Sequence, residues 1–361
     1  MEKPRLYTAI GLMSGTSLDG IDAAMIRTDG QGLVERIGFY TAPYDPQVRD
    51  ALRACLGLRH DPDGRVAHAA EVMTRAHIDA VRALMAAHPD EPVDLIGFHG
   101  QTIFHDPGSR FTWQIGDAAL LAHETGIDVI HDFRQADVQA GGQGAPFLPL
   151  YHAALAASQP KPVAILNLGG VGNVTYLGPD NVPIAFDTGP ANALIDDWVK
   201  QHTAMTYDAG GKIAAAGTVH KDVVNDYLSH AFFKKAPPKS LDRDQWTLDR
   251  VRGLSLEDGA ATLTDFTVQA VFNALAHLPQ SPQAWYVTGG GRHNATLMQG
   301  LRHALGVPVK TVDDLGWNGD AMEAEGFAYL AVRSDLGLPL SVPTTTGVPK
   351  PLTGGLKCRA F

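Results

Sequence analysis

The chain of 361 residues has only two cysteines, Cys55 and Cys358. So few cysteines cannot form the disulfide framework of a small secreted protein, and the sequence shows no spacing typical of a zinc site. It also lacks an apolar run near the roughly 20 residues that a membrane-spanning helix needs. Residues 1–8 are not followed by the apolar segment of a signal peptide. We therefore expect a cytoplasmic protein that does not contact a membrane.

Runs of basic residues are missing as well. The formal net charge is −10, with 29 lysines and arginines against 39 aspartates and glutamates. This balance disfavours binding to nucleic acid or to an anionic membrane surface. A chain this acidic that binds phosphate has to do so through converging backbone N–H groups or through a metal ion.

Glycine is abundant, with 38 residues, and it is clustered in loops. The first cluster, "MSGTSLDG" (residues 13–20), lies between two apolar β-forming segments. It lacks the lysine of a P-loop and leads into a second strand rather than a helix. Its small residues still allow backbone N–H groups to converge on phosphate, whereas Asp19 and Asp22 would need Mg²⁺ between them and the anion. A polar hairpin turn explains the loop equally well.

Two further glycine loops follow predicted strands. They are "NLGGVGN" (residues 167–173) and "VTGGGRHN" (residues 287–294), and the second precedes a predicted helix start. Each alone is a common kind of turn. Three such loops at strand ends in one chain favour a nucleotide as the ligand.

Strands alternate with helices along the chain, which is typical of an α/β fold. The opening pattern of strand, glycine-rich turn and strand returns in the second half and suggests a duplicated domain. The Gly- and Pro-rich segment 139–149 is a candidate crossing between domains. We predict one domain from residues 1–138 with 338–361 and another from residues 139–337.

Several elements are predicted from local signals. Asp45 as N-cap and Pro46 at the first helical position mark a helix start. Helices are also expected within residues 64–89, where Pro89 ends the helix, and at residues 118–125, 219–232, 260–277, 295–305 and 320–335. The polar, proline-bearing segment 234–246 is predicted to be a surface loop.

Asp187 in "AFDTGPAN" ends a predicted buried strand and meets a Thr-Gly-Pro turn. Carboxyl ends of strands in α/β proteins face ligand clefts, so Asp187 is placed to deprotonate a hydroxyl group or water. The alternative is that its side chain only caps the turn and the following helix.

A cluster of His and Asp residues, His99, His105, His131 and Asp132, allows a metal-hydrolase interpretation. Catalytic zinc normally takes three protein ligands, and no HxxxH or HxH pair occurs among them, so structural histidines are the better interpretation. Arg134 differs, because a guanidinium group suits a ligand carboxylate.

The predicted helix 320–335 carries two glutamates. Glu323 shares a helix face with Phe327, and a glutamate on an apolar face is unusual without a partner. Glu325 is expected to point into solvent.

The sequence resembles the anhydro-N-acetylmuramic acid kinase family. The matching segments run in order from residue 10 to about 331, and "SGTSLDG" with "FDTGP" is the most specific combination. They are "GLMSGTSLDGID", "GFHGQTIFHDP", "WQIGD", "VIHDFRQADVQAGGQGAPF", "NLGGVGNVTYL", "FDTGPAN", "PPKSLDR", "TGGGRHN" and "MEAEGFAYLA".

This resemblance implies an actin-like ATPase (ribonuclease H-like) fold, in which two α/β domains enclose a nucleotide cleft. It implies a phosphotransferase with an alcohol-group acceptor that uses ATP and Mg²⁺. The implied reaction opens the 1,6-anhydro ring of the amino sugar with water and phosphorylates O6. The products are N-acetylmuramate 6-phosphate and ADP, formed during peptidoglycan recycling.

The resemblance also assigns roles to residues. Asp187 would take the proton of the attacking water, and Arg134 would bind the lactyl carboxylate. The nucleotide would contact Ser14, Gly15, Thr16, Ser17, Leu18, Asp19, Gly20, Asp22, Gly169, Gly170, Asn173, Gly289, Gly290 and Gly291. The sugar would contact Thr102, Asp132, Arg134 and Glu323. Asp19 is the expected metal ligand, although no motif fixes it.

The expected partner is a small amino sugar, and the sequence leaves a homodimer open. Two other functions also stay open at this point. A His/Asp metal hydrolase predicts tight zinc binding without a need for ATP. A regulatory actin-like ATPase predicts nucleotide binding without dependence on a sugar.

Overall fold

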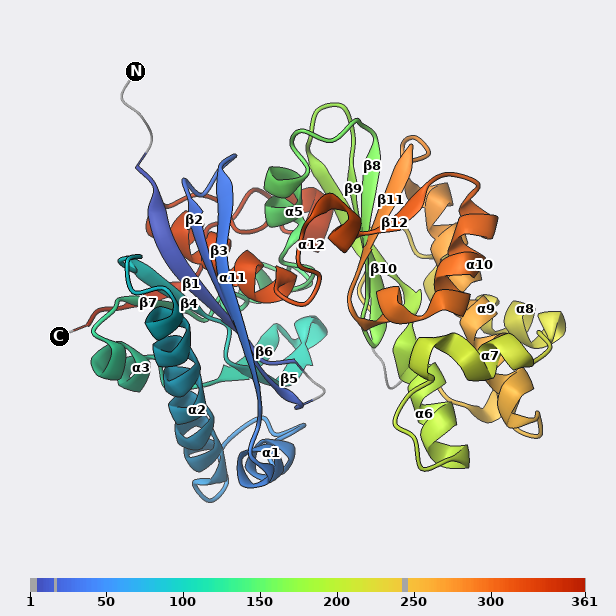
Figure 1. The fold of residues 1–361 in the computed structure, drawn as a ribbon, viewed down its shortest axis with the longest axis horizontal. Helices are drawn as coiled ribbons and strands as arrows, with labels where there is room; N and C mark the ends of the chain where they lie inside the picture. The colour runs from blue at the N-terminus through green and yellow to red at the C-terminus, as the bar shows by residue number, and fades with distance from the viewer. Residues whose placement is uncertain (1–4, 16–17, 242–245, 361) are drawn as a thin grey trace. The chain divides into compact units, whose positions relative to one another are not determined.

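A computed structural model describes residues 5–15, 18–241 and 246–360 (Figure 1). The chain forms two compact units, Met1–Ala157 with Ala321–Phe361, and Ser158–Asp320. These boundaries differ from those predicted after residues 138 and 337. Helix α11 (Met322–Asp335), which the sequence led us to place in the second domain, packs on strands of the first unit.

The first unit contains a six-stranded sheet in the order β13-β7-β4-β1-β2-β3. Its first three strands form an antiparallel meander, and β4 and β7 run parallel to β1. The strands are β1 (Tyr7–Met13), β2 (Gly20–Thr28), β3 (Val34–Pro43), β4 (Leu95–Phe98), β7 (Val129–His131) and β13 (Leu356–Cys358). A separate hairpin of β5 (Gln101–Asp106) and β6 (Phe111–Ile115) was not predicted.

The second unit repeats this plan. Its five-stranded sheet has the order β10-β9-β8-β11-β12, again with three antiparallel strands followed by two parallel ones. The strands are β8 (Val163–Leu168), β9 (Val171–Leu177), β10 (Pro183–Pro190), β11 (Ala284–Thr288) and β12 (Val309–Thr311). The shared strand order confirms the predicted duplication and the ribonuclease H-like topology of each unit.

Helices cover both faces of the first unit's sheet (Figure 1). Ile10 and Leu12 of β1 point into an apolar core shared with α2, while Gly11 faces α11. A Cβ atom at Gly11 would lie 1.8 Å from the Ala324 carbonyl oxygen, so only glycine permits this close approach. The helices of this unit are α1 (Pro46–Arg53), α2 (Arg65–Ala87), η1 (Pro107–Ser109), α3 (Ala118–Thr125), α4 (Gln135–Gln139), α5 (Pro149–Leu155), α11 and α12 (Pro343–Thr346).

In the second unit, side chains of β8, β9 and β10 form a core with α9 and α10. The helices are α6 (Asn192–His202), η2 (Ala209–Gly211), α7 (Lys212–Ala216), α8 (Lys221–Leu228), η3 (Ala231–Lys234), η5 (Asp249–Val251), α9 (Leu256–Ala274), η6 (Leu275–His277), η7 (Gly290–His293), α10 (Ala295–Leu305) and η8 (Val312–Leu315). Within the described residues, no helix combines the length and apolar character that crossing a bilayer requires.

Candidate active site

Four polar residues form a row across the sheet of the second unit. Thr288 of β11 lies opposite Asn167 of β8, Asn167 opposite Asn173 of β9, and Asn173 opposite Asp187 of β10. Residues directly opposite one another in a sheet point to the same face, and the alternate residues of these strands enter the core. The sheet therefore presents Asp187 and a predicted nucleotide-binding residue, Asn173, on one face.

The two glycine loops of this unit meet at the end of that row. Gly169 and Gly170 join β8 to β9, and Gly289 follows β11 with a φ of 75°. A Cβ atom at Gly289 would lie 2.8 Å from the Leu168 carbonyl oxygen, and one at Gly291 would lie 2.6 Å from Leu168 Cβ. The structure thus brings together two loops that the sequence predicted separately, and both glycines are required for this contact.

Asp187 lies where β10 is irregular, and a neighbouring segment holds it there. Its backbone N–H donates to the Lys239 carbonyl at 3.0 Å, and the Leu241 N–H donates to its Oδ2 at 2.7 Å. The side chain makes no cap bond to α6, whose N-cap is Ala191, so the interpretation of Asp187 as a cap of that helix is wrong. In the predicted surface loop 234–246, residues 234–236 and 238 are exposed as expected, whereas Lys239 is buried at 7% exposure; residues 242–245 lie outside the described chain.

The electrostatics of Asp187 suit a base. Burial raises its pKa from 3.8 to about 7, while the Leu241 hydrogen bond and the charge of Lys239 act in the opposite direction. Burial lowers the pKa of Lys239 to about 8, against the effect of Asp187. A carboxylate with a pKa near neutral pH can accept a proton in the reaction and release it afterwards.

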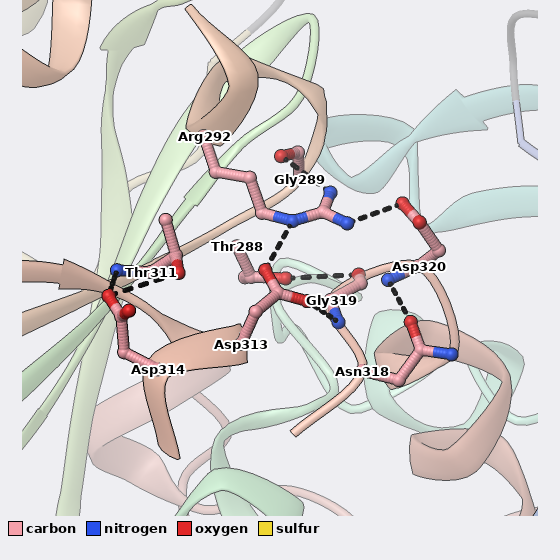
Figure 2. A network of polar contacts seen from close by, with 9 residues as sticks. All are labelled: Thr288, Gly289, Arg292, Thr311, Asp313, Asp314, Asn318, Gly319 and Asp320. Atoms are coloured by element: carbon pink, nitrogen blue, oxygen red, sulfur yellow. Dashed lines mark hydrogen bonds and ion pairs between the residues drawn. The ribbon is translucent and has the colours of Figure 1, made fainter. Parts of the chain in front are cut away.

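Arg292 connects the glycine loop of η7 to two later segments, as Figure 2 shows. Its guanidinium bonds to Asp313 Oδ2 at 2.8 Å, to Asp320 Oδ1 at 2.8 Å and to the Gly289 carbonyl at 3.1 Å. Thr288 Oγ1 donates to the Gly319 carbonyl at 3.2 Å. The side chain of Arg292 is only 3% exposed, so this buried network holds the turn at Gly289 in place.

In the first unit, the loop after β1 turns at Leu18, which has a φ of 57° and donates its N–H to the Gly15 carbonyl at 3.2 Å. Ser14 is buried; its Oγ donates to Gln101 Oε1 at 2.6 Å and accepts from the Tyr44 hydroxyl at 2.8 Å. Ser14 therefore anchors the base of the loop through its side chain. Thr16 and Ser17, which were predicted to contact the nucleotide, lie outside the described residues.

Arg134 is half-buried in the first unit and contacts His99. Its Nε donates to His99 Nε2 at 3.0 Å, so the His99 proton lies on Nδ1, which donates to the Gly100 carbonyl at 2.7 Å. Burial lowers the pKa of Arg134 to about 10, while the nearby charge of Glu323 raises it. The structure thus brings together two of the predicted sugar-binding residues.

Thr102 is linked to the same region through side chains of the β5–β6 hairpin. Gln114 Nε2 donates to Thr102 Oγ1 at 3.1 Å and to Thr112 Oγ1 at 2.8 Å. His105 then bridges Thr112 Oγ1 and the Gln143 carbonyl, next to the Gly144 carbonyl that accepts from Arg134. Asp132, two residues before Arg134, has a φ of 56°, and burial raises its pKa.

Both ring nitrogens of His99 and of His105 are engaged in these contacts. In the described part of the chain, no three side chains of His, Cys, Asp or Glu come together to hold a metal ion. The geometry therefore gives no support to the metal-hydrolase interpretation.

Comparison with known proteins gives one family for nearly the whole chain. Residues 7–358 match the family described as anhydro-N-acetylmuramic acid kinase. Two curated relatives of that name are 55% identical over 359 residues (Rhizorhabdus wittichii; 97% of this chain and 98% of the relative) and 51% identical over 352 residues (Rhodospirillum rubrum; 96% and 93%). The chain belongs to the anhydro-N-acetylmuramic acid kinase family.

Solved structures show a more distant likeness. The activator of the 2-hydroxyisocaproyl-CoA dehydratase from Clostridium difficile with bound ADPNP is 11% identical, with a TM-score of 0.45, over 91% of this chain and 96% of that one.

The prediction for one glutamate of this kinase was wrong. Glu325 was expected in solvent, yet it is 3% exposed, and its Oε2 accepts from the Tyr151 hydroxyl at 2.6 Å. Glu323 is the more exposed of the two glutamates. The expectation failed because α11 is buried on nearly all sides, so helical periodicity does not separate an inner from an outer face.

Lys239 and Arg292 were not singled out either. "PPKSLDR" and "TGGGRHN" contain them and were already part of the family resemblance, which was the available signal.

Proposed function

We propose that this chain uses ATP and water to open the 1,6-anhydro bond of 1,6-anhydro-N-acetylmuramic acid and to phosphorylate O6. The products are N-acetylmuramate 6-phosphate and ADP, as cell-wall recycling requires. The observation that carries the chemistry is Asp187, a buried carboxylate with a pKa of about 7 on the same sheet face as Asn173 and beside the glycine loops.

The substrate has no free O6 hydroxyl group, so water must first attack C1. Asp187 takes one proton of that water as the C1–O bond forms and the C1–O6 bond breaks. The electron pair left on O6 then forms the bond to the γ-phosphorus, and the bond between that phosphorus and the β,γ-bridging oxygen breaks to release ADP. Phosphoryl transfer needs positioning and charge neutralisation more than covalent help from the protein.

The glycine loops supply the positioning. Gly169, Gly170 and Gly289–Gly291 would approach the nucleotide through backbone, with Asn173 beside them. Gly15, Leu18, Gly20 and Asp22 of the first unit would contact the phosphates as part of the β1–β2 loop.

Mg²⁺ fits the chemistry of that loop. Asp19 is exposed and Asp22 follows on β2, and the charges of both act on the Tyr44 hydroxyl, so the two carboxylates lie in one region. Mg²⁺ takes one or two carboxylates together with phosphate oxygens and water, and Asp19 would hold it. When bound, the ion would neutralise charge on the transferred phosphoryl group.

The sugar would be held by Arg134, Asp132, Thr102 and Glu323. Arg134 would pair with the lactyl carboxylate, because a partly desolvated guanidinium gains most from a bidentate anion. Since the reaction consumes ATP, we place the protein in the cytoplasm. The sequence leaves a homodimer open, and light scattering would measure the oligomeric state.

The test is an assay of zinc-free protein with Mg-ATP, with and without the anhydro sugar, in ¹⁸O-labelled water. We expect ADP formation that depends on the sugar, with one ¹⁸O atom at C1 of the product and none in its phosphate. D187N should lose turnover while it still binds ATP. Label in free inorganic phosphate, released without the sugar, would overturn the proposal and favour a regulatory ATPase.

A further inference from the structure

We propose that Asn192 is a positioning residue for the nucleotide, whose side-chain amide holds the two glycine loops of the second unit against each other. The inference rests on the proposed function, in which residues 169–170 and 289–291 approach ATP through their backbone. Asn192 would not contact the nucleotide; it would fix the spacing of the two loops that do.

The first support is the way in which helix α6 begins. Its N-cap, Ala191, makes no side-chain cap bond, and the first backbone N–H groups of a helix need other acceptors. The Gly170 carbonyl accepts from the N–H groups of Ala191 and Ala193, at 3.0 and 3.2 Å. The Gly169 carbonyl accepts from the Asn192 N–H at 3.0 Å. The start of α6 and the first glycine loop therefore hold each other in place.

These bonds also orient the peptide unit that joins Gly169 to Gly170. The carbonyl group of a trans peptide points in the opposite direction to its N–H group. Since the Gly169 carbonyl points to α6, the Gly170 N–H points away from the helix. The start of α6 thus determines the side on which this loop offers an N–H group, the kind of donor that binds phosphate.

The second support is the half-buried side chain of Asn192. Its Nδ2 donates at 2.8 Å to the carbonyl of Leu168, the residue directly before the first glycine loop. A Cβ atom at Gly291 would lie 3.2 Å from Asn192 Oδ1, and one at Gly290 would lie 3.9 Å from Asn192 Nδ2. One amide group is therefore bonded at the base of the first loop and lies beside the second.

Glycine loops need such an external constraint. They carry no side chains that could pack, and glycine loses more conformational freedom than other residues when it is fixed. Arg292 holds the second loop at the Gly289 carbonyl. Asn192 adds a link between the two loops, so its loss should weaken binding of the nucleotide and leave binding of the sugar unchanged.

The experiment compares N192L with the intact enzyme by steady-state kinetics, with each substrate varied in turn. Leucine has the branched shape of asparagine but no amide group. We expect KM for ATP to rise about tenfold, because the bond to the Leu168 carbonyl is lost. The Kd of a non-hydrolysable ATP analogue, measured by calorimetry, should rise by the same factor. N192Q, which keeps an amide donor, should recover part of the affinity.

The other kinetic constants separate this role from a general loss of structure. KM for the anhydro sugar should stay within about twofold of the intact enzyme. The value of kcat should fall by less than about threefold, because the Leu241 N–H still holds the Asp187 carboxylate. If N192L does not fold, N192A replaces it, with the same expected rise of KM for ATP.

T267V is the matched control at the same junction. Thr267 of α9 is 2% exposed, and its Oγ1 donates to the Pro190 and Ala191 carbonyls, at 3.3 and 3.4 Å, where α6 begins. Loss of this hydroxyl group should lower the urea midpoint of unfolding, while both KM values stay within about twofold.

Equal rises of KM for ATP in N192L and T267V would overturn the inference, because any disturbance of the start of α6 would then be enough. An unchanged KM for ATP in N192L, or an equal rise of KM for ATP and for the sugar, would also contradict it. Failure of the proposed function is visible separately, as no sugar-dependent formation of ADP by the intact protein.

Discussion

Arg292 and Asp313 form an ion pair at 2.8 Å in which the guanidinium is 3% exposed and the carboxylate 46% exposed. The next residue, Asp314, faces away from Arg292 and accepts from the Thr311 N–H at 2.8 Å (Figure 2). The two adjacent aspartates therefore have different roles. Asp313 holds Arg292 at the Gly289 turn, and Asp314 caps the short helix η8.

This difference gives a matched pair of variants. D313N should raise KM for ATP about tenfold, equivalent to about 1.4 kcal/mol, because Arg292 then holds the Gly289 turn less firmly. KM for the sugar should change little. D314N should leave both constants within about twofold, and steady-state kinetics would show whether it does. Equal effects of the two changes on KM for ATP would contradict the positioning of the turn by Arg292.

Asp187 should destabilise the folded protein near neutral pH, where its buried side chain becomes ionised. Its pKa is 3.8 in the reference state and about 7 in the fold, so the folded protein binds this proton more tightly than the unfolded chain. Its contribution to the free energy of unfolding is most favourable below about pH 4 and declines as the pH rises to about 7. Above pH 7 the decline is complete.

D187N removes this dependence. The free energy of unfolding of the variant, relative to that of the intact protein, should be about 3 kcal/mol higher at pH 8 than at pH 5. This change arises over the two pH units between pH 5 and the pKa of about 7, at about 1.4 kcal/mol for each unit. Urea unfolding at the two pH values measures the gain. An identical difference at both would show that Asp187 does not titrate in this range.

Local signals predicted most of the elements of this fold. The Asp45-Pro46 start gives α1 at Pro46–Arg53, and the helices at 118–125 and 295–305 have the predicted bounds. These elements have caps and periodicity that act within a few residues. The repeated strand–turn–strand pattern predicted the duplication, because a glycine turn between two apolar runs is visible without tertiary context.

The surroundings of Asp187 could not be predicted from such local signals. Lys239 follows Asp187 by many residues, and two prolines and neighbouring charges make its segment look like a surface loop. Its burial depends on pairing with the edge of β10, which is a long-range contact. The prediction for Glu325 was wrong for a related reason, because its partner Tyr151 lies on a helix that is distant in the sequence.

The hydrogen bond from the Tyr151 hydroxyl should reduce the destabilisation that the buried Glu325 carboxylate causes. Burial raises the pKa of Glu325, and the Tyr151 hydroxyl lowers it by donating to the carboxylate. Y151F therefore leaves a buried carboxylate without this donor, and the free energy of unfolding should fall by about 1–3 kcal/mol. The loss should be larger at pH 8 than at pH 5, because the ionised form suffers most.

Y329F is the control for this variant. Tyr329 packs on Tyr151, with ring centres 5.5 Å apart, but its hydroxyl donates to the Gln31 carbonyl at 2.8 Å. Y329F, which removes this hydroxyl group, should lower the free energy of unfolding by a similar amount at pH 5 and at pH 8. Thermal or urea unfolding at pH 5 and pH 8 compares the two, and a pH-independent loss in Y151F would contradict the role given to the ionised Glu325.

Arg134 should select for the lactyl group of the sugar. R134K keeps a positive charge but loses the planar fork that binds a carboxylate at two points and the Nε that donates to His99. We expect KM for 1,6-anhydro-N-acetylmuramic acid to rise at least tenfold, while KM for ATP stays within about twofold. With 1,6-anhydro-N-acetylglucosamine, which has no lactyl group, R134K and the intact enzyme should differ much less. R59K, at an exposed arginine paired with Asp106, should leave all of these values unchanged. If R134K raised KM by the same factor for both sugars, Arg134 would support the structure of the site rather than recognise the carboxylate.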